Sequence, residues 1–338
     1  MKERVFITGI TGMVGSHLLD YIFNKTNFEI YGFARWRSPL DNINHHIKEI
    51  NKKNNRIKII YGDLNDKSSV HNAIKFVKPK LVFHLAAQSY PTFSYTAPNV
   101  TYEANIIGTT NLCDALYNYS RNSIIHICSS SEVYGKVDKK NIPIKENCPF
   151  HPASPYSISK IGADLIGQHY AEAYGMNIQI TRMFTHTGPR RGDVFAESSF
   201  AKQIAMIEKN YIDPIIKVGN INSMRTILDV RDAVRAYYIL LTHNPIPGSV
   251  YNIGGNHSCE ISKILEFLIS SSKRRDITYE VDQQRIRPID ANNQIPDCTK
   301  FINHTKWKPN YSFEETMTDL LNYWRNIVSI KGKDFLQR

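Results

Sequence analysis

The stretch "TGITGMVG" at residues 8–15 decides the fold class of this 338-residue chain. A short apolar run precedes it at residues 4–8, and an amphipathic, helix-like stretch follows it. Glycines at positions 9, 12 and 15 permit a tight turn from strand to helix and close backbone approach to a pyrophosphate. Such glycines also occur in ordinary turns, and their spacing is GxxGxxG rather than GxGxxG. Their place between a strand and a helix favours a dinucleotide-binding unit.

Further apolar runs follow at the spacing of βαβ units, at residues 28–34, 56–64, 80–89, 123–135 and 178–184. Because they are nearly continuous rather than alternating, they fit parallel strands that are buried on both faces. We predict an α/β fold, with a Rossmann doubly wound parallel sheet and a smaller α/β substrate-binding domain. The larger domain is expected to take residues 1–183 and about 225–254, and the smaller one about 184–224 and 255–330.

The end of the second predicted strand selects the dinucleotide. In an NAD site a carboxylate at this point hydrogen bonds the ribose hydroxyls, whereas a cation accommodates a 2′-phosphate. This chain has no carboxylate there, but it has Arg35, Trp36 and Arg37. Since arginine forms bidentate pairs with phosphate oxygens, the residues favour NADP. The alternative is that these arginines are solvated loop residues of a basic chain.

Tyr156 and Lys160 lie four residues apart in "SPYSISK", residues 154–160, and would share one face of a helix. An ammonium group near the phenol would lower the pKa of Tyr156 toward the working pH. The phenolate could then take the proton of a sugar hydroxyl while the carbon gives up a hydride. An isolated pair of this kind is usually a surface feature, but here it follows a nucleotide-binding pattern and indicates nicotinamide redox chemistry.

The chain at this point resembles the extended short-chain dehydrogenase/reductase family, and within it the nucleotide-sugar 4,6-dehydratases of the GDP-mannose dehydratase type. The resemblance runs from about residue 4 to about residue 325. Besides the two motifs above, it rests on "HLAAQS" (84–89), "SSSEVYGKV" (129–137), "THTGPRRG" (185–192) and "RPIDANNQIPDCTK" (287–300). It implies that the larger domain binds NADP and that the smaller one binds a GDP-sugar. The substrate would be GDP-mannose, a GDP-heptose or GDP-N-acetylglucosamine.

A 4,6-dehydratase must oxidise C4, remove the C5 proton, expel water from C6 and return the hydride to C6, so it needs a base besides Tyr156. The resemblance implies that Glu132 is this base and that Ser130 lies at the C4 hydroxyl. The predicted catalytic residues are Ser130, Glu132, Tyr156 and Lys160. Position 131 is Ser rather than the acidic Asp of dTDP-glucose dehydratases, so Glu132, a Ser hydroxyl or water must assist departure of the C6 hydroxyl. Alternatively, Glu132 only caps a helix or forms an ion pair.

The predicted binding residues come from the strand ends, the glycine turn and the arginine-containing segments. Those for the cofactor are Gly9, Thr11, Gly12, Met13, Val14, Arg35, Asp63, Leu64, Leu85, Ala86, Ala87, Tyr156, Lys160 and His186. Those for the substrate are Ser89, Ser131, Arg190, Arg191, Arg225 and Arg287. The arginines suit a diphosphate because their planar donors match paired phosphate oxygens. Arg190 and Arg191 could also serve a neighbouring subunit.

Two alternatives to a dehydratase remain. Residues 185–192 depart from the family pattern Asn-His-Glu-Ser-Pro-Arg-Arg-Gly at Thr185, Thr187 and Gly188. These differences make the segment more similar in sequence to that of the GDP-4-keto-6-deoxymannose reductases. An NADPH-dependent reductase, or a nucleotide-sugar epimerase on the same scaffold, is therefore the second hypothesis. The third is a catalytically silent NADP-binding scaffold. The polar insert at residues 35–56 corresponds to a region that contacts a neighbouring subunit in this family, so a homodimer or homotetramer is expected.

The net charge of +11 raises the question of nucleic-acid binding. The lysines are scattered and lack a zinc knuckle or a recognition-helix pattern, so a basic surface that attracts an anionic nucleotide sugar is the simpler explanation. The five cysteines lack CxxC spacing and the histidines form no cluster at metal-ligand spacing, so we predict no metal site. With neither a signal peptide nor an apolar run of about 18 residues, a cytoplasmic protein without a membrane span is expected.

Overall fold

A computed structural model describes residues 3–289 and 291–336. Its larger sheet contains seven parallel strands in the order β10-β6-β5-β4-β1-β2-β3. The strands are β1 (Arg4–Thr8), β2 (Glu29–Ala34), β3 (Ile57–Tyr61), β4 (Leu81–His84), β5 (Ile124–Cys128), β6 (Asn177–Met183) and β10 (Val250–Ile253). This is the doubly wound Rossmann order, which confirms the predicted fold class.

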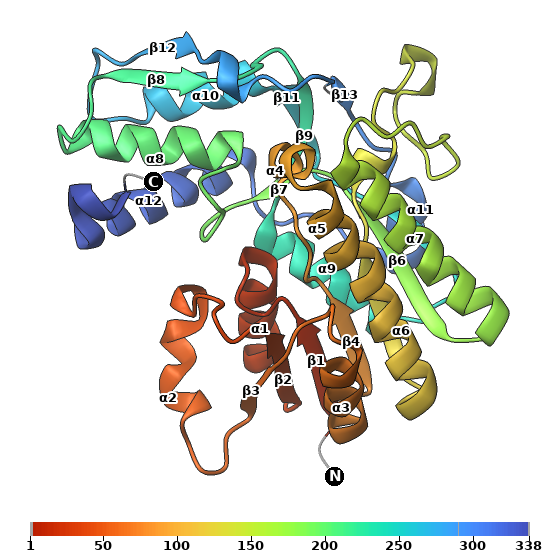
Figure 1. The fold of residues 1–338 in the computed structure, drawn as a ribbon. Helices are drawn as coiled ribbons and strands as arrows, with labels where there is room; N and C mark the ends of the chain where they lie inside the picture. The colour runs from red at the N-terminus through yellow and green to blue at the C-terminus, as the bar shows by residue number, and fades with distance from the viewer. Residues whose placement is uncertain (1–2, 290, 337–338) are drawn as a thin grey trace.

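Helices cover both faces of this sheet (Figure 1). On one face α1 (Met13–Lys25) packs against α9 (Val230–Thr242), and their core includes Val5 and Ile7 of β1. On the other face lie α3 (Lys67–Val77), α6 (Gly108–Tyr119) and α7 (Pro155–Tyr174), whose core includes Phe6. Successive side chains of a strand point to opposite faces, so the apolar run of β1 supplies both cores.

A smaller part of the chain packs around its own hydrophobic core, which includes Phe200, Leu265 and Trp324. Its helices are α8 (Ala196–Glu208), α10 (Ile261–Ser270) and α12 (Phe313–Leu336). One small sheet pairs β8 (Ile215–Val218) with β12 (Thr278–Val281). In the other, β9 (Met224–Asp229) pairs with β7 (His186–Thr187), β11 (His257–Glu260) and β13 (Asn293–Gln294).

The start of α12 has the capping box that its sequence predicts. The Ser312 N–H donates to Glu315 Oε2 over 2.8 Å, and the Glu315 N–H donates to Ser312 Oγ over 3.1 Å. Each side chain therefore satisfies a backbone N–H of the other residue, which fixes where the helix begins.

The chain crosses between the two parts more than once. Both α9 and β10 lie with the larger sheet, since α9 packs on α1 and β10 pairs with β6. Phe301 and Trp307 also belong to the core around α1 and α9, although they come from the segment assigned to the smaller domain. We propose that the two-domain division holds, with α11 (Thr299–Thr305) counted with the larger sheet.

The insert at residues 35–56 folds into a 3-10 helix at Asp41–His46 and the short α2 (Ile47–Ile50). Two further short helices, α4 (Pro91–Thr96) and α5 (Pro98–Tyr102), precede a π-helical turn at Glu103–Ile107 that leads into α6. Over the described residues, every helix is too short or too polar to cross a membrane.

Candidate active site

The glycine turn brings three chain segments into close contact. Gly9 has a φ of +70°, and a Cβ there would lie 2.8 Å from the backbone of Ala86. A Cβ at Gly15 would lie 2.1 Å from the carbonyl oxygen of Gly9. Larger residues would therefore separate β1 from α1 and from the loop after β4. These two glycines are required by packing, whichever ligand the turn holds.

The N-terminus of α1 is suited to an anion. Gly12 is its N-cap and is exposed, no side chain caps the helix, and its first turn contains no acidic residue. The first N–H groups of a helix have no partner within the helix, and its dipole favours negative charge there. Thr11, Met13 and Val14, three predicted cofactor residues, adjoin this N-terminus in the chain, and the exposed, uncapped helix end fits a dinucleotide pyrophosphate.

A hydrogen-bond chain that the sequence analysis missed holds the loop after β4. The Thr8 hydroxyl accepts the N–H groups of Leu85 and Ala86, each over 3.1 Å, and donates to His84 Nδ1 over 2.9 Å. Burial lowers the pKa of His84 to about 3, so the ring is neutral, and its Nε2 donates to Thr109 Oγ1 over 2.9 Å. This chain sets the backbone of Leu85 and Ala86, two predicted cofactor residues, against the glycine turn.

The ends of β2 and β3 form the outer rim of the same sheet edge, since the carboxyl ends of parallel strands lie together. Arg35 and Asp63 are both exposed there. Trp36, 76% exposed, places its ring 4.9 Å from that of Tyr61. The structure therefore leaves Arg35 and Asp63 accessible beside the glycine turn.

The candidate catalytic residues meet at the end of β5 and the start of α7. Ser154 caps α7 by accepting the Ser157 N–H over 3.1 Å, and this positions Tyr156 in the first turn. Tyr156 is hydrogen bonded by Ser130, whose Oγ also accepts the Glu132 N–H over 3.2 Å. The Lys160 ammonium donates to the carbonyl oxygen of Cys128, the last residue of β5, over 2.7 Å.

The electrostatics of Tyr156 differ from the expectation based on sequence. Burial raises the pKa of Tyr156, and the charges of Cys128 and Glu132 add to this, whereas the Ser130 hydrogen bond and the charge of Arg191 oppose it. Lys160 was expected to lower this pKa, but its ammonium is held by the Cys128 carbonyl, and burial lowers the pKa of Lys160 itself. The nearby cation that favours the phenolate is Arg191.

Arg191 lies inside the site. Its guanidinium carbon is 3.4 Å from the ring centroid of Phe195, and its Nε donates to Glu197 Oε1 over 3.2 Å. Its positive charge lowers the pKa of both Tyr156 and His186. Burial lowers the pKa of His186 to about 4, so this imidazole is neutral and donates from Nδ1 to the Phe184 carbonyl over 3.1 Å.

Arg190 points elsewhere, although it is the next residue in the chain. It has a φ of +69°, and its Nη1 lies 2.8 Å from Oδ2 of Asp20 on α1. The two arginines, predicted together as substrate ligands, therefore contact different parts of the molecule.

The other two predicted substrate arginines come from β9, which contains Arg225, and from the segment before β13, which contains Arg287. Arg225 donates from Nη1 to the carbonyl oxygens of Met224 and Ala291, over 2.9 and 2.7 Å, and so ties β9 to the segment before β13. Arg287 Nη1 lies 3.9 Å from Glu132 Oε1. The structure thus places Arg287, but not Arg225, beside a candidate catalytic group.

The two serines predicted to bind the substrate differ in exposure. Ser131 is buried in the turn with Glu132, and Ser89 is exposed after β4.

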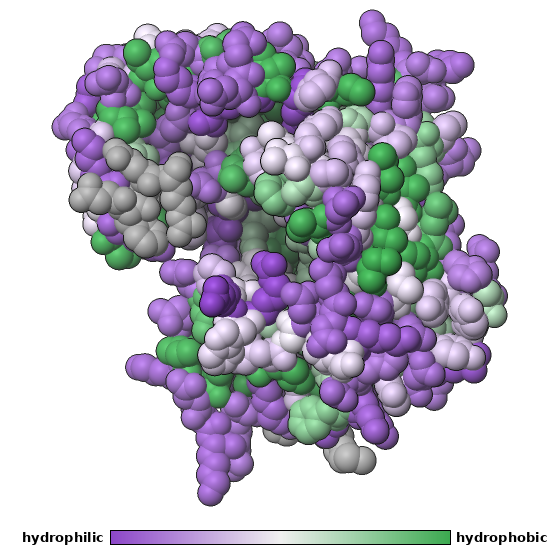
Figure 2. Space-filling model, in the orientation of Figure 1, coloured by the Kyte–Doolittle hydropathy of each residue, from purple (hydrophilic) through white to green (hydrophobic). Residues whose placement is uncertain are grey.

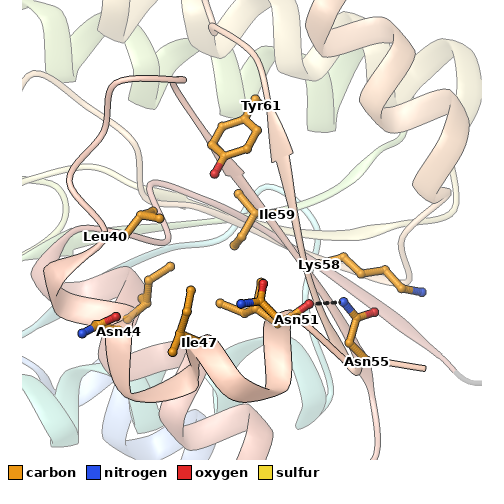
Figure 3. A pocket seen from close by; sticks show the side chains of 10 residues that line it. Leu40, Asn44, Ile47, Asn51, Asn55, Lys58, Ile59 and Tyr61 are labelled. Atoms are coloured by element: carbon orange, nitrogen blue, oxygen red, sulfur yellow. Dashed lines mark hydrogen bonds between the residues drawn. The ribbon is translucent and has the colours of Figure 1, made fainter. Parts of the chain in front are cut away.

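Two cavities lie apart from this cluster. One of about 430 Å³ separates the insert from β3 and is lined by residues that include Leu40, Ile47 and Tyr61 (Figure 3). The other, of about 460 Å³, is lined by residues that include Arg182 and Lys300. Neither contains a candidate catalytic residue. Figure 2 shows a mostly hydrophilic face that is hollowed between the part with α8 and the part with α1.

A further cluster lies outside the predicted site. His45 Nε2 and His46 Nε2 each lie 2.7 Å from Oδ1 of Asp20. The sequence analysis found no histidine cluster at metal-ligand spacing, because Asp20 is distant in the chain and only the folded insert returns to α1. The prediction of no metal site therefore missed a group of three possible ligands.

Comparison with known proteins places this site in a family. The model of the family "GDP-mannose 4,6 dehydratase" matches residues 6–320. The Arabidopsis thaliana protein GDP-mannose 4,6 dehydratase 2 is 30% identical over 93% of this chain and 84% of its own. A Pseudomonas aeruginosa GDP-6-deoxy-D-mannose reductase is 28% identical over 97% and 99%. The solved structure of RMD from Pseudomonas aeruginosa complexed with NADPH has a TM-score of 0.81 at 27% identity, over 97% of this chain and all of that one. Because the family model spans most of the chain, the protein belongs to the GDP-mannose 4,6-dehydratase family, as its motifs predict.

Proposed function

We propose that this chain is a GDP-sugar 4,6-dehydratase, which converts GDP-mannose, a GDP-heptose or GDP-N-acetylglucosamine into the GDP-4-keto-6-deoxy sugar. The observation that carries the proposal is the position of Glu132. Its negative charge raises the pKa of the Tyr156 phenol, and its Oε1 lies 3.9 Å from Arg287 Nη1. A hydroxyl oxidation needs only the phenol. A carboxylate at the same point supplies the second base that elimination requires.

NADP is the proposed cofactor. The exposed Gly12 and the N-terminus of α1 would hold its pyrophosphate, Arg35 its 2′-phosphate, and Asp63 and Leu64 its adenosine. When bound, NADP⁺ would supply the hydride acceptor for oxidation at C4 and, once reduced, the hydride donor for C6. Because the hydride is returned, only catalytic amounts of the cofactor are needed.

Side chains of this protein carry out the proton transfers. Tyr156 takes the proton of the C4 hydroxyl, which Ser130 positions through its hydrogen bond to the phenol. The new C4 ketone acidifies the C5 hydrogen, and Glu132 removes that proton. The C6 hydroxyl then leaves as water with the proton that Glu132 carries. After the hydride reaches C6, C5 takes up a proton from solvent while Tyr156 releases the proton that it took from the C4 hydroxyl, so Tyr156 and Glu132 return to their starting protonation states.

Arg287 and Arg191 have separate roles in this proposal. Arg287 orients the Glu132 carboxylate, since its Nη1 lies 3.9 Å from Oε1. Arg191 supplies the positive charge that favours the Tyr156 phenolate against the effect of burial. Lys160 is held by the Cys128 carbonyl near the phenol, where it would contact the cofactor ribose.

A reductase of GDP-4-keto-6-deoxy sugars is the second candidate. The sequence of residues 185–192 resembles that of such reductases, and one relative carries the name of a GDP-6-deoxy-D-mannose reductase. A reductase would use Tyr156 as the acid that protonates the C4 oxygen, and it would have no need of Glu132 as a base.

One assay separates the two. The purified chain is incubated with each GDP-sugar and a catalytic amount of NADP⁺. A dehydratase forms the 4-keto-6-deoxy product while the NADPH absorbance stays flat. Stoichiometric loss of NADPH on a GDP-4-keto-6-deoxy sugar, with no product from the GDP-hexoses, would assign the reductase instead.

The oligomeric state is a proposal from the same family resemblance. We expect a homodimer or homotetramer, and light scattering on the eluting protein would measure its mass. A monomer at assay concentration would contradict this expectation.

A further inference from the structure

Three side chains with no role in the proposed reaction meet on the outside of α1. Asp20 comes from that helix, and His45 and His46 end the 3-10 helix of the insert. Both Nε2 atoms lie 2.7 Å from the same carboxylate oxygen, Asp20 Oδ1. The three ligand-type atoms all lie within 4.8 Å of one another.

These atoms are of the type that binds zinc and similar ions. Neutral imidazole nitrogens and a carboxylate oxygen are the usual non-sulfur ligands of Zn²⁺, Co²⁺ and Ni²⁺. Around a tetrahedral ion with bonds of about 2.0–2.1 Å, the ligand atoms lie about 3.3 Å apart. The 2.7 Å separations would therefore open by about half an ångström, which rotation of the exposed His45 and a small shift of the partly exposed Asp20 carboxylate would supply.

The surroundings hold two of the three groups in place. The second carboxylate oxygen of Asp20 forms an ion pair with Arg190, whose Nη1 lies 2.8 Å away, and ligating carboxylates commonly have such an outer partner. The His46 ring packs edge-on against Phe23, with 5.1 Å between the ring centroids.

The third group leaves the site open on one side. The His45 side chain is 46% exposed, compared with 10% for His46 and 25% for Asp20. Water could complete the coordination of an ion on the His45 side. The positive charge of Arg190 opposes a second cation, so the binding should be weaker than at a site built only of ligands.

We propose that Asp20, His45 and His46 bind a divalent transition-metal ion of the zinc class, with the fourth position open to solvent. The ion would have a structural role, because it would join the insert to α1. The insert already reaches the glycine turn, since Asn42 Nδ2 donates to the Thr11 carbonyl over 3.0 Å. Through Arg190, Asp20 also holds the loop that carries Arg191. An ion here would therefore restrain both loops that border the active site.

The test uses the untagged full chain after removal of metal with a chelator. Co²⁺ is titrated while its visible absorption is recorded, and Zn²⁺ binding is measured by calorimetry. We expect one ion per chain and a Zn²⁺-dependent rise in the thermal midpoint, since an ion that binds only the folded state stabilises it. His45→Gln should weaken binding by at least about tenfold and remove this rise. His169→Gln, at an exposed histidine of α7 outside the cluster, is the matched control and should bind as the parent does.

His45 is exposed, so its substitution should leave the fold intact, and circular dichroism checks this. His46→Gln provides a second loss of a ligand. The proposal is overturned if the parent chain binds no stoichiometric ion, or if both variants bind Co²⁺ as tightly as His169→Gln does. Since these measurements do not use turnover, failure of the proposed dehydratase activity would leave them unaffected.

Discussion

Arg191 and the buried Glu197 form a partly buried ion pair near the candidate catalytic phenol, with Arg191 Nε donating to Glu197 Oε1 over 3.2 Å. The guanidinium carbon of Arg191 lies 3.4 Å from the ring centroid of Phe195. An arginine held in this way cannot turn freely toward an outer diphosphate. Its charge acts on Tyr156, where the effect of burial must be overcome for the phenolate to form. Glu197 is thus a positioning residue, and Arg191 supplies the charge.

The first prediction concerns the pH dependence that this pair creates. The proton acceptor at C4 is the Tyr156 phenolate, so the rate should rise with pH as the phenol loses its proton. Arg191→Met removes a charge that lowers the pKa of Tyr156, so the rising limb of the pH–rate profile should move to higher pH. Each unit of movement costs roughly tenfold in kcat/KM at pH 7. Arg275→Met, at an exposed arginine after α10 and far in sequence from Arg191 and Tyr156, is the control, and an equal limb in both variants would exclude Arg191 from this role.

The second prediction tests the elimination base. Glu132→Gln keeps the shape of the side chain but cannot remove the C5 proton, so exchange of C5 hydrogen with solvent deuterium should stop. Turnover should fall by about 10²–10⁴-fold, the usual contribution of a general base. NADP⁺ binding, followed by fluorescence, should be unchanged because Glu132 lies at the sugar end of the site. Turnover at the parental rate would remove Glu132 from the mechanism.

The third prediction concerns the choice of dinucleotide. Arg35 is exposed at the end of β2, and the proposed contact is with the 2′-phosphate alone. Arg35→Ala should weaken NADP⁺ binding by at least about tenfold, since a hydrogen bond to a charged group contributes about 1.5–3 kcal/mol. NAD⁺ lacks this phosphate, so its affinity should not change. Calorimetry with both dinucleotides gives the comparison, and a parallel loss of both would indicate a general defect of the site.

The fourth prediction compares two glycines by their surroundings. An alanine Cβ at position 15 would lie 2.1 Å from the Gly9 carbonyl oxygen, so Gly15→Ala must displace α1 from β1. We expect a loss of about 3 kcal/mol in the free energy of unfolding. Gly175→Ala is the control: its φ of +64° carries the left-handed cost of about 1–2 kcal/mol, but among the described residues no atom outside its own chain neighbourhood lies within 4 Å of the added methyl. Denaturant unfolding measures both, and equal losses would show that the contact with Gly9 does not matter.

The local parts of the site could be predicted from sequence because each depends on residues close together in the chain. The glycine turn, the Tyr156–Lys160 spacing and the Ser312–Glu315 cap all lie within one turn or one helix. Their structures follow from backbone geometry and helix periodicity. The buried strands were predictable for a similar reason, since nearly continuous apolar runs are typical of parallel strands that are buried on both faces.

The pairing of charges was less predictable because it depends on which surfaces meet. Arg190 and Arg191 are adjacent in sequence, but Arg190, which has a positive φ, pairs with Asp20 of α1, whereas Arg191 pairs with Glu197 and packs on Phe195. Lys160 was expected to be the cation for Tyr156, yet its ammonium donates to a backbone carbonyl. Local spacing could not indicate either partner.

The sequence by itself indicated the family, the parallel strands and glycine turn of a doubly wound sheet, and the identity of the residues available for proton transfer. Those properties depend on residue type and on neighbours within a few positions. Only the tertiary structure decided that Arg287 faces Glu132, that Arg191 and Glu197 pair beside Tyr156, and that Asp20 receives both His45 and His46. Each of these contacts joins separate elements, and the energy of a charge depends on the burial and partners that only the packed chain provides.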